Sequence, residues 1–339
     1  MNKLNLFTNT HLKSYLQKRA GEVRFGEQVK LLTSVSNIYD QLVDLDVDHV
    51  IIGLPEDVGV FANYGKTGTY KAWDVTLKIL LNIQSNQFTK ANKTLLLGHL
   101  DFSKELKACS QLDQSVKKDV QKARKLVADI DKVVSNLVSQ VVKAGKKPIL
   151  IGGGHNNAYG NIKGTALGLN TAINAINFDV HSDFRREEGR HSGNGFSYAY
   201  TEGFLKKYFV FGLQENYTSQ EVFFTMDKIK SIKYNTFEGL RVRNELQFTA
   251  EMENALNFIG NEPFGIEIDC DAIENIPSSA MTPSGFKVSK AREFVHHFAK
   301  HPNATYIHIC EAAPTPETET LVGKLITYLI TDFIRAHAN

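Results

Sequence analysis

The most informative segment of the chain is Asn177-Phe178-Asp179-Val180-His181-Ser182-Asp183-Phe184-Arg185. It overlaps a short apolar run, residues 173–178, that predicts a buried strand. Asp179, His181 and Asp183 stand at alternate positions, and alternate residues of a strand share one face, so these three potential metal ligands should converge. Burying unpaired charges is costly. Packing therefore does not explain an imidazole between two carboxylates, and the segment predicts a metal site rather than a structural ion-pair cluster.

Two further apolar runs end in side chains of the same kind. Residues 148–151 lead into Gly152-Gly153-Gly154-His155, where glycines let the backbone approach a neighbour closely and leave His155 at the end of a strand. Residues 264–268 lead into Asp269-Cys270-Asp271, again with alternate spacing. Each pattern alone is weak, but three strand ends with six ligands predict one metal centre. The six are His155, Asp179, His181, Asp183, Asp269 and Asp271.

The chemistry of this ligand set favours two divalent ions. Four aspartates supply four negative charges and the two histidines can bind as neutral imidazoles, so two divalent ions balance the cluster and one leaves it negative. Carboxylates outnumber imidazoles and no thiolate is needed, which suits Mn²⁺ better than a structural zinc. Cys270 lies between two ligands and should point to the opposite face. Two such ions can share one water and lower its pKa toward neutrality.

The three blocks occur in the order found in the ureohydrolase superfamily of arginase, agmatinase and formimidoylglutamase, which this sequence resembles over residues 53–314. The resemblance implies an arginase-like fold, a homo-oligomer, and a binuclear manganese hydrolase that attacks a guanidino or formimidoyl carbon. It also implies that Asp179 and Asp269 bridge the two ions. One ion would be completed by His155 and Asp183 and the other by His181 and Asp271, with Asp183 also acting in catalysis by moving a proton.

The chain departs from the family pattern beside these ligands. Glu267 replaces a serine that usually precedes the Asp-x-Asp block, and Glu274 replaces a later aspartate. Neither change removes a ligand, but both alter the residues expected to support the ligands.

Glu311, in Glu311-Ala312-Ala313-Pro314, matches the acidic residue with which the family grips the amidine end of its substrate. A carboxylate suits a planar cationic N–C–N group, which can donate paired hydrogen bonds. The resemblance therefore assigns Glu311 to catalysis and substrate binding. The alternative interpretation is an acid at the N-terminus of a helix.

Other differences concern the substrate. Gly154 stands where arginases and agmatinases usually have aspartate, and Phe196 stands where arginases place a histidine. The missing imidazole argues against arginase-type proton transfer unless neighbouring His191 takes part. The Gly-Gly-Gly-His block and the extension of the central block to Arg185 both resemble formimidoylglutamases. Arg185 could bind a substrate carboxylate in a bidentate fashion, or it could neutralise ligand charge or pair with Glu187 or Glu188. His191 and Asn194 are also predicted to bind substrate.

The favoured function is hydrolysis of N-formimidoyl-L-glutamate to L-glutamate and formamide. A guanidino hydrolase that releases urea is the alternative, and a non-catalytic metal-binding protein is a third possibility from another class.

Bulk properties restrict the remaining classes. The chain has 339 residues, a formal net charge of +2 and 22% charged residues, so no general bias toward nucleic acid or membrane is present. The small-molecule substrate is what the family resemblance implies. The first 23 residues lack the apolar core of a signal peptide. Three cysteines without paired spacing favour a reduced, cytoplasmic protein.

The pattern of apolar runs predicts one doubly wound, three-layer α/β/α domain over residues 1–339 with a mostly parallel sheet of about eight strands. Helical spacing over residues 115–144 ends at Gly145, and a terminal helix is expected over residues 317–336. Residues 1–45 are expected to form a helical extension, with an amphipathic helix and a turn over residues 24–48. Residues 53–68 form a glycine-punctuated loop that either lines a pocket or lies on the surface. The predicted strands are residues 49–53, 94–98, 148–151, 173–178, 208–212, 232–235, 264–269 and 305–310.

Overall fold

The computed structural model describes residues 3–337, in which nine strands form a single sheet in the order β1-β3-β2-β4-β9-β8-β5-β6-β7. All neighbouring strands are parallel except β1, which pairs with β3 in the antiparallel direction. The eight predicted strands are confirmed. The strands are β1 (Leu4–Leu6), β2 (His49–Gly53), β3 (Thr94–Leu100), β4 (Lys147–Ile151), β5 (Ile173–Phe178), β6 (Leu205–Leu213), β7 (Ile232–Thr236), β8 (Phe264–Asp269) and β9 (Ala304–Cys310).

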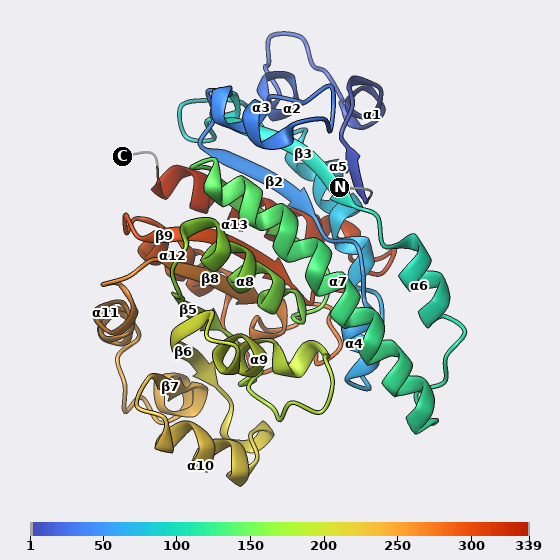
Figure 1. Cartoon of the computed structure of the whole chain (residues 1–339). Helices are drawn as coiled ribbons and strands as arrows, with labels where there is room; N and C mark the ends of the chain where they lie inside the picture. The colour runs from blue at the N-terminus through green and yellow to red at the C-terminus, as the bar shows by residue number, and fades with distance from the viewer. Residues whose placement is uncertain (1–2, 338–339) are drawn as a thin grey trace.

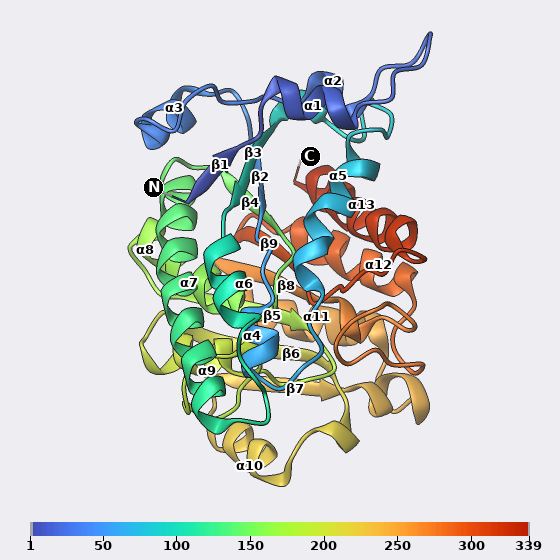
Figure 2. The ribbon, with the colours of Figure 1, turned by 90° about the vertical axis from the view of Figure 1, so that its right-hand side faces the viewer.

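Helices cover both faces of the sheet and give the predicted three layers (Figure 1). One face packs against α4, α7, α8 and α9, and the other against α5, α11, α12 and α13, as the side view shows (Figure 2). The helices are α1 (Asn9–Tyr15), α2 (Phe25–Gln28), α3 (Ile38–Asp44), α4 (Val58–Ala62), α5 (Ala72–Leu80), α6 (Ser103–Cys109), α7 (Lys117–Lys143), α8 (Asn157–Leu169), α9 (Gly195–Thr201), α10 (Gln220–Lys228), α11 (Phe248–Ile259), α12 (Val288–Ala299) and α13 (Glu319–Ala336).

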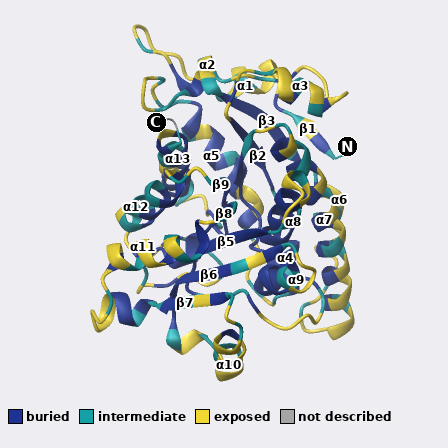
Figure 3. Cartoon of the chain, turned by 60° about the vertical axis from the view of Figure 1, so that its left-hand side comes forward, coloured by how far each residue is buried: buried dark blue, intermediate teal, exposed yellow. Residues whose placement is uncertain are grey.

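Two apolar cores lie between these layers. Alternate residues of the central strands point to opposite faces, so that Ile149 and Ile151 join the core under α5 and α13 while Leu150 joins the core under α7 and α8. The central strands of the sheet are accordingly buried. Exposed residues lie on the outer sides of the helices, in the loops and on strands toward the edges of the sheet, such as β6 and β7 (Figure 3). None of the helices in residues 3–337 is long and apolar enough to cross a membrane.

The N-terminal region differs from the helical extension that the sequence predicted. It begins with the edge strand β1, whose Leu4 pairs with Leu100, and continues with three short helices. Gly98, at φ +132°, makes this pairing possible, because a Cβ there would lie 2.0 Å from the carbonyl oxygen of Asn5.

The single amphipathic helix expected within residues 24–48 is also wrong. Two short helices, α2 and α3, flank an extended stretch there. In that stretch the Lys30 amide donates to the Thr94 carbonyl at 2.9 Å and the Leu96 amide donates to the Lys30 carbonyl at 3.0 Å. Pairing with β3 therefore replaces the local hydrogen bonds that a continuous helix would have made.

The sheet order determines where the site lies. Four strands that are distant in sequence, β4, β9, β8 and β5, are consecutive at the centre of the sheet and are all parallel. Their carboxyl ends therefore meet at one edge of the sheet, the usual place for a site in a doubly wound fold. Each of these strands is followed or ended by one of the residues singled out above.

Candidate metal centre and active site

His155 lies at the middle of three carboxylates at this edge. Its Nδ1 is 2.9 Å from Asp183 Oδ2, 3.1 Å from Asp269 Oδ2 and 3.2 Å from Asp179 Oδ2. One ligand atom from each of the four residues lies within 4.8 Å of the others, which is a spacing that fits one metal ion.

A second group of ligands shares Asp179 with the first. His181 Nδ1 is 3.1 Å from Asp271 Oδ2 and 3.6 Å from Asp179 Oδ1. Asp179 thus presents one carboxylate oxygen to each group, as a bridging ligand would. The structure brings together all six predicted ligands, and it groups Asp269 with His155.

The backbone directs the aspartates. The Asp179 carboxylate accepts a hydrogen bond from the His181 amide at 2.7 Å, and Asp269 accepts one from the Asp271 amide at 2.8 Å. In each pair the first aspartate is fixed by the turn that carries the second ligand. The spacing of the two motifs therefore sets the orientation of the carboxylates as well as their position.

The residues present fit divalent metal ions. Three carboxylate oxygens crowd His155 Nδ1 within 3.2 Å. Asp271 Oδ1 is buried and, within the described part of the chain, has no hydrogen-bond partner. Burial raises the pKa of Asp269 well above its ordinary value, and the charges of Asp271 and Asp179 add to the rise. Burial also raises the pKa of Asp271 to about 6. Cations held among these carboxylates would relieve this repulsion and give the buried Asp271 oxygen a partner.

A cavity of about 440 Å³ opens onto the ligands. His181, Asp183, Asp269 and Asp271 line it, together with Glu311. The remaining lining residues include hydroxyl side chains and one arginine: Ser182, Arg185, Ser192, Tyr217, Thr218, Ser219 and Ser279.

Glu311 lies beside the ligands. It follows β9, is buried, and accepts a hydrogen bond from the His155 backbone amide through Oε1 at 2.8 Å. Its backbone has φ +60° and that of Asp183 has φ +44°, a conformation that costs free energy for residues other than glycine. Two acidic residues of one cavity are thus held in strained backbone, as is common where a site needs a particular side-chain direction.

Arg185 reaches the cavity from the loop after β5. Its Nη1 donates to the Asn63 side-chain oxygen at 2.7 Å, and within residues 3–337 it makes no ion pair. The two glutamates considered as partners are engaged elsewhere: Glu188 pairs with Arg124 at 3.0 Å and Glu187 accepts from Thr201 at 2.5 Å. The guanidinium is therefore available to an anion in the cavity.

His191 and Asn194, also predicted to bind substrate, are buried and do not line this cavity. The Asn194 oxygen accepts from Arg190 and from the His191 amide, and its nitrogen donates to the carbonyl of Gly189 at 2.9 Å. His191 Nδ1 accepts from the Gly193 amide at 3.1 Å, and burial lowers the pKa of its imidazole to about 3. The structure thus places both in the internal bonding of the loop before α9.

Two substitutions relative to arginases have physical explanations. A Cβ at Gly154 would lie 2.6 Å from Asn156 Oδ1 and 2.8 Å from Val60 Cγ2, so a side chain there would require both neighbours to shift. Phe196 is buried, stacks on Tyr208 with ring centroids 4.3 Å apart, and meets the ring of His155 edge-on at 5.3 Å. Phe196 therefore packs against the ring of His155, a candidate metal ligand, and does not line the cavity.

The sequence did not single out Glu56 or connect Asn63 with Arg185. Glu56 is buried in the loop after β2 and accepts hydrogen bonds from the Gly154 amide at 3.2 Å and the Asn157 side chain at 2.6 Å. It thereby holds the turn that carries His155. The only signal was the glycine-punctuated loop in which both residues lie, and this loop does contribute to the cavity through Asn63.

Comparison with known proteins places the chain. The model of the arginase family matches residues 47–334. A curated formimidoylglutamase of Streptococcus pyogenes is 25% identical over 295 residues, which cover 83% of each chain.

Two solved structures share the fold. Formimidoylglutamase of Bacillus subtilis has a TM-score of 0.73 at 18% identity, over 95% of this chain and 94% of that one. Formiminoglutamase of Trypanosoma cruzi with Mn²⁺ has a TM-score of 0.69 at 19% identity, over 94% of this chain and 100% of that one. With a family match over most of its length and a ligand set assembled at the centre of its sheet, the chain belongs to the arginase family, as a metal-dependent hydrolase of amidine carbon–nitrogen bonds.

Proposed function

We propose that this protein hydrolyses N-formimidoyl-L-glutamate to L-glutamate and formamide at a centre of two Mn²⁺ ions. The observation that carries the proposal is the position of Arg185, which lines the same cavity as Glu311 and the candidate ligands and makes no ion pair within residues 3–337. The carboxylates of the candidate ligands and Glu311 make one part of the cavity anionic. The guanidinium of Arg185 is a cation that, within the described residues, has no anionic partner.

This arrangement suits a substrate with opposite charges at its two ends. A formimidoyl group is a planar N–C–N cation that Glu311 can hold, and the glutamate portion offers two carboxylates to Arg185. Because its nitrogen carries the formimidoyl group, the substrate has no free ammonium. Agmatine has an ammonium at the end that would face Arg185, so the same cavity should bind it poorly.

The proposed ligands are those that the sequence predicted. His155, Asp179, Asp183 and Asp269 would hold one ion, and Asp179, His181, Asp269 and Asp271 the other. Bound as a pair, the ions would supply a water acidic enough to attack near neutral pH. The carboxylate-rich set and the neighbouring formiminoglutamase solved with Mn²⁺ support manganese.

The chain's own groups complete the reaction. Glu311 holds the amidinium so that its carbon faces the attacking water. Asp183, which lines the cavity beside His155, takes the proton of that water and delivers it to the leaving amine nitrogen of glutamate. Arg185 keeps the glutamate carboxylate in place throughout.

Glu311 by itself would suit a guanidinium equally well, so a guanidino hydrolase that releases urea is the competing function. The proposal also includes a cytoplasmic homo-oligomer. The three unpaired cysteines support the compartment, and the family resemblance supports the assembly.

The test is turnover of N-formimidoyl-L-glutamate, arginine, agmatine and guanidinobutyrate by protein supplied with Mn²⁺, with formamide and urea measured separately. We expect formamide from the first substrate and no urea from the others. Urea as the main product would retain the metal chemistry and overturn the choice of substrate. No turnover of any of the four by protein that binds two Mn²⁺ ions would overturn both.

A further inference from the structure

Glu267 is a buried carboxylate that neither belongs to the candidate ligand set nor lines the cavity. It lies on β8 two residues before Asp269 and therefore on the same face of the strand. In the sheet it pairs with Asn177 of β5 on one side and with His308 of β9 on the other. It thus sits one layer below the ligands, in the middle of the strands that carry them.

Three side chains face the Glu267 carboxylate. The Tyr306 hydroxyl donates to Oε1 at 2.7 Å, and His308 Nδ1 lies 2.6 Å from Oε2. The third is His155, whose Nε2 lies 3.5 Å from Oε2. A buried carboxylate is costly unless it has such partners.

The two nitrogens of His155 have different surroundings. Nδ1 faces the carboxylates of Asp179, Asp183 and Asp269, and a metal ion held there needs its lone pair. The proton of a neutral imidazole must then be on Nε2, the nitrogen that faces Glu267. Within the described residues Nε2 is buried and has no hydrogen-bond partner, and Glu267 Oε2, at 3.5 Å, is the carboxylate oxygen that pairs with it.

We propose that Glu267 is the positioning residue of the metal centre: its carboxylate accepts the Nε2 proton of His155, fixes the tautomer that offers Nδ1 to an ion, and increases the basicity of that nitrogen. This inference rests on the proposed metal centre and adds a residue to it. Its partners Tyr306 and His308 hold the carboxylate in place.

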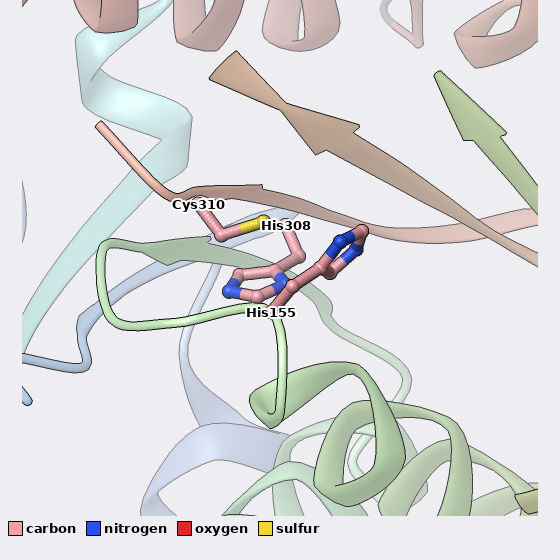
Figure 4. Close-up of side chains that lie close together, drawn as sticks. All are labelled: His155, His308 and Cys310. Carbon is pink, nitrogen blue, oxygen red and sulfur yellow. The ribbon is translucent and has the colours of Figure 1, made fainter. Parts of the chain in front are cut away.

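The neighbouring contacts connect Glu267 to the backbone that carries His155. His308 Nε2 is 3.2 Å from the carbonyl oxygen of Gly152, in the turn that leads to His155. The turn and β9 thereby bring His155 and His308 together, with ring centroids 6.1 Å apart (Figure 4). Cys310 lies beside the same two rings (Figure 4). Its thiol donates to the Ile268 carbonyl at 3.5 Å. Burial raises the pKa of the Cys310 thiol well above its ordinary value, so the thiol stays neutral and is a weak acceptor. Among the groups gathered around His155 Nε2, the Glu267 carboxylate is the stronger acceptor.

Room for this network is built into β8. A Cβ at Gly265 would lie 2.4 Å from the Tyr306 hydroxyl oxygen and closer still to its ring. Gly265 thus lets the Tyr306 ring cross β8 and reach Glu267 at the next inward position.

The test compares Glu267→Gln with Tyr306→Phe in the full chain. Glu267→Gln keeps the shape of the side chain and removes its charge, whereas Tyr306→Phe removes a hydrogen bond to the oxygen that faces away from His155. Mn²⁺ binding is measured by calorimetry and by metal content after dialysis. Electron paramagnetic resonance distinguishes a coupled pair of ions from a single ion. If the role of Glu267 were merely structural, the spectrum of the folded variant would still be that of a coupled pair.

We expect the wild type to bind two ions as a coupled pair. In Glu267→Gln the ion beside His155 should bind about 10- to 100-fold more weakly, the loss usual for such supporting contacts, and at limiting Mn²⁺ the spectrum should become that of single ions. Tyr306→Phe should stay within about threefold of wild type. The metal-free proteins are compared by thermal unfolding, and Glu267→Asp, whose carboxylate is too short to reach His155, replaces Glu267→Gln if the latter does not fold.

Wild-type affinity and a coupled spectrum in a folded Glu267 variant would overturn this inference and leave the proposed function standing. An equal loss in Tyr306→Phe would overturn it as well, since general loosening of the core would then explain the effect. A wild type that binds no Mn²⁺ would overturn the inference and the proposed function together.

Discussion

The guanidinium of Arg185 donates a hydrogen bond across 2.7 Å to the side-chain oxygen of Asn63, and the side-chain nitrogen of Asn63 donates to the Ser192 hydroxyl at 3.2 Å. This link joins the loop after β5 to the end of α4. It holds a long side chain that would otherwise sample many rotamers, so the position of the only arginine lining the cavity, among the described residues, depends on an amide from a different loop.

Replacement of Asn63 by alanine should therefore raise KM for N-formimidoyl-L-glutamate while kcat changes little. A hydrogen bond to a charged group at a partly exposed site contributes about 1.5 kcal/mol, which corresponds to roughly a tenfold change. Steady-state kinetics measure both constants. Asn63→Asp should raise KM further, because its carboxylate would compete with the substrate for Arg185, and an unchanged KM in both variants would rule out this role.

Removal of the Arg185 charge should affect one class of substrate. Arg185→Gln is expected to lower kcat/KM for N-formimidoyl-L-glutamate by about 100-fold, or about 3 kcal/mol, because a bidentate contact with a carboxylate is lost. It should not lower any residual activity on agmatine. Arg186→Gln is the matched control, since Arg186 pairs with Glu221 and does not line the metal cavity. Equal losses in both variants would point to a general effect of charge.

Asp179 offers an oxygen to each ligand group, so its replacement should weaken both ions. Asp179→Asn is expected to reduce bound Mn²⁺ from two ions to one or fewer, and kcat by at least about 10³-fold, as loss of the activated water implies. Metal content and turnover are measured together. Asp129→Asn, at an exposed position paired only with Lys132, should behave as wild type. Full activity of Asp179→Asn with two ions bound would refute the ligand assignment.

His49 should make stability depend on pH. It is buried at the start of β2, neither ring nitrogen has a hydrogen-bond partner within residues 3–337, and burial lowers its pKa to about 3. As pH falls from about 6.5 toward 3, the unfolded chain binds a proton that the folded chain does not, so the free energy of unfolding decreases by about 1.4 kcal/mol per pH unit.

The variant His49→Leu should lose this share of the pH dependence. Urea unfolding of wild type and variant is compared between pH 4 and 8 in the presence of a chelator, so that the other titrating groups cancel in the difference. We expect the variant to gain stability relative to wild type as pH falls below 6.5. A difference that does not change with pH would mean that His49 has the same pKa in the folded and the unfolded chain, and would overturn the prediction.

The sequence allowed prediction of those parts of the fold that follow from local patterns. Apolar runs predicted eight strands, helical spacing predicted α7 and α13, and alternate spacing predicted the ligands that meet at the ends of β5 and β8. The strand β1 was missed because it has only three residues and exists through pairing with β3, nearly a hundred residues away.

The same limit explains the site residues that the sequence did not reveal. Asn63 and Glu56 act through contacts with residues about a hundred positions distant or more, and no local pattern encodes such contacts. Conversely, His191 and Asn194 lie close in sequence to cavity residues, but their hydrogen-bonding atoms are engaged inside their own loop. Proximity along the chain could not separate a side chain that faces the cavity from one that supports it.

The left-handed backbone at Asp183 and Glu311 has a consequence for the evolution of this protein. Glycine or asparagine would adopt that conformation at lower cost, so each acidic residue is retained against a standing pressure from stability. A library of random variants selected only for heat resistance should drift toward glycine or asparagine at positions 183 and 311, and its most robust members should be the ones that no longer turn over substrate.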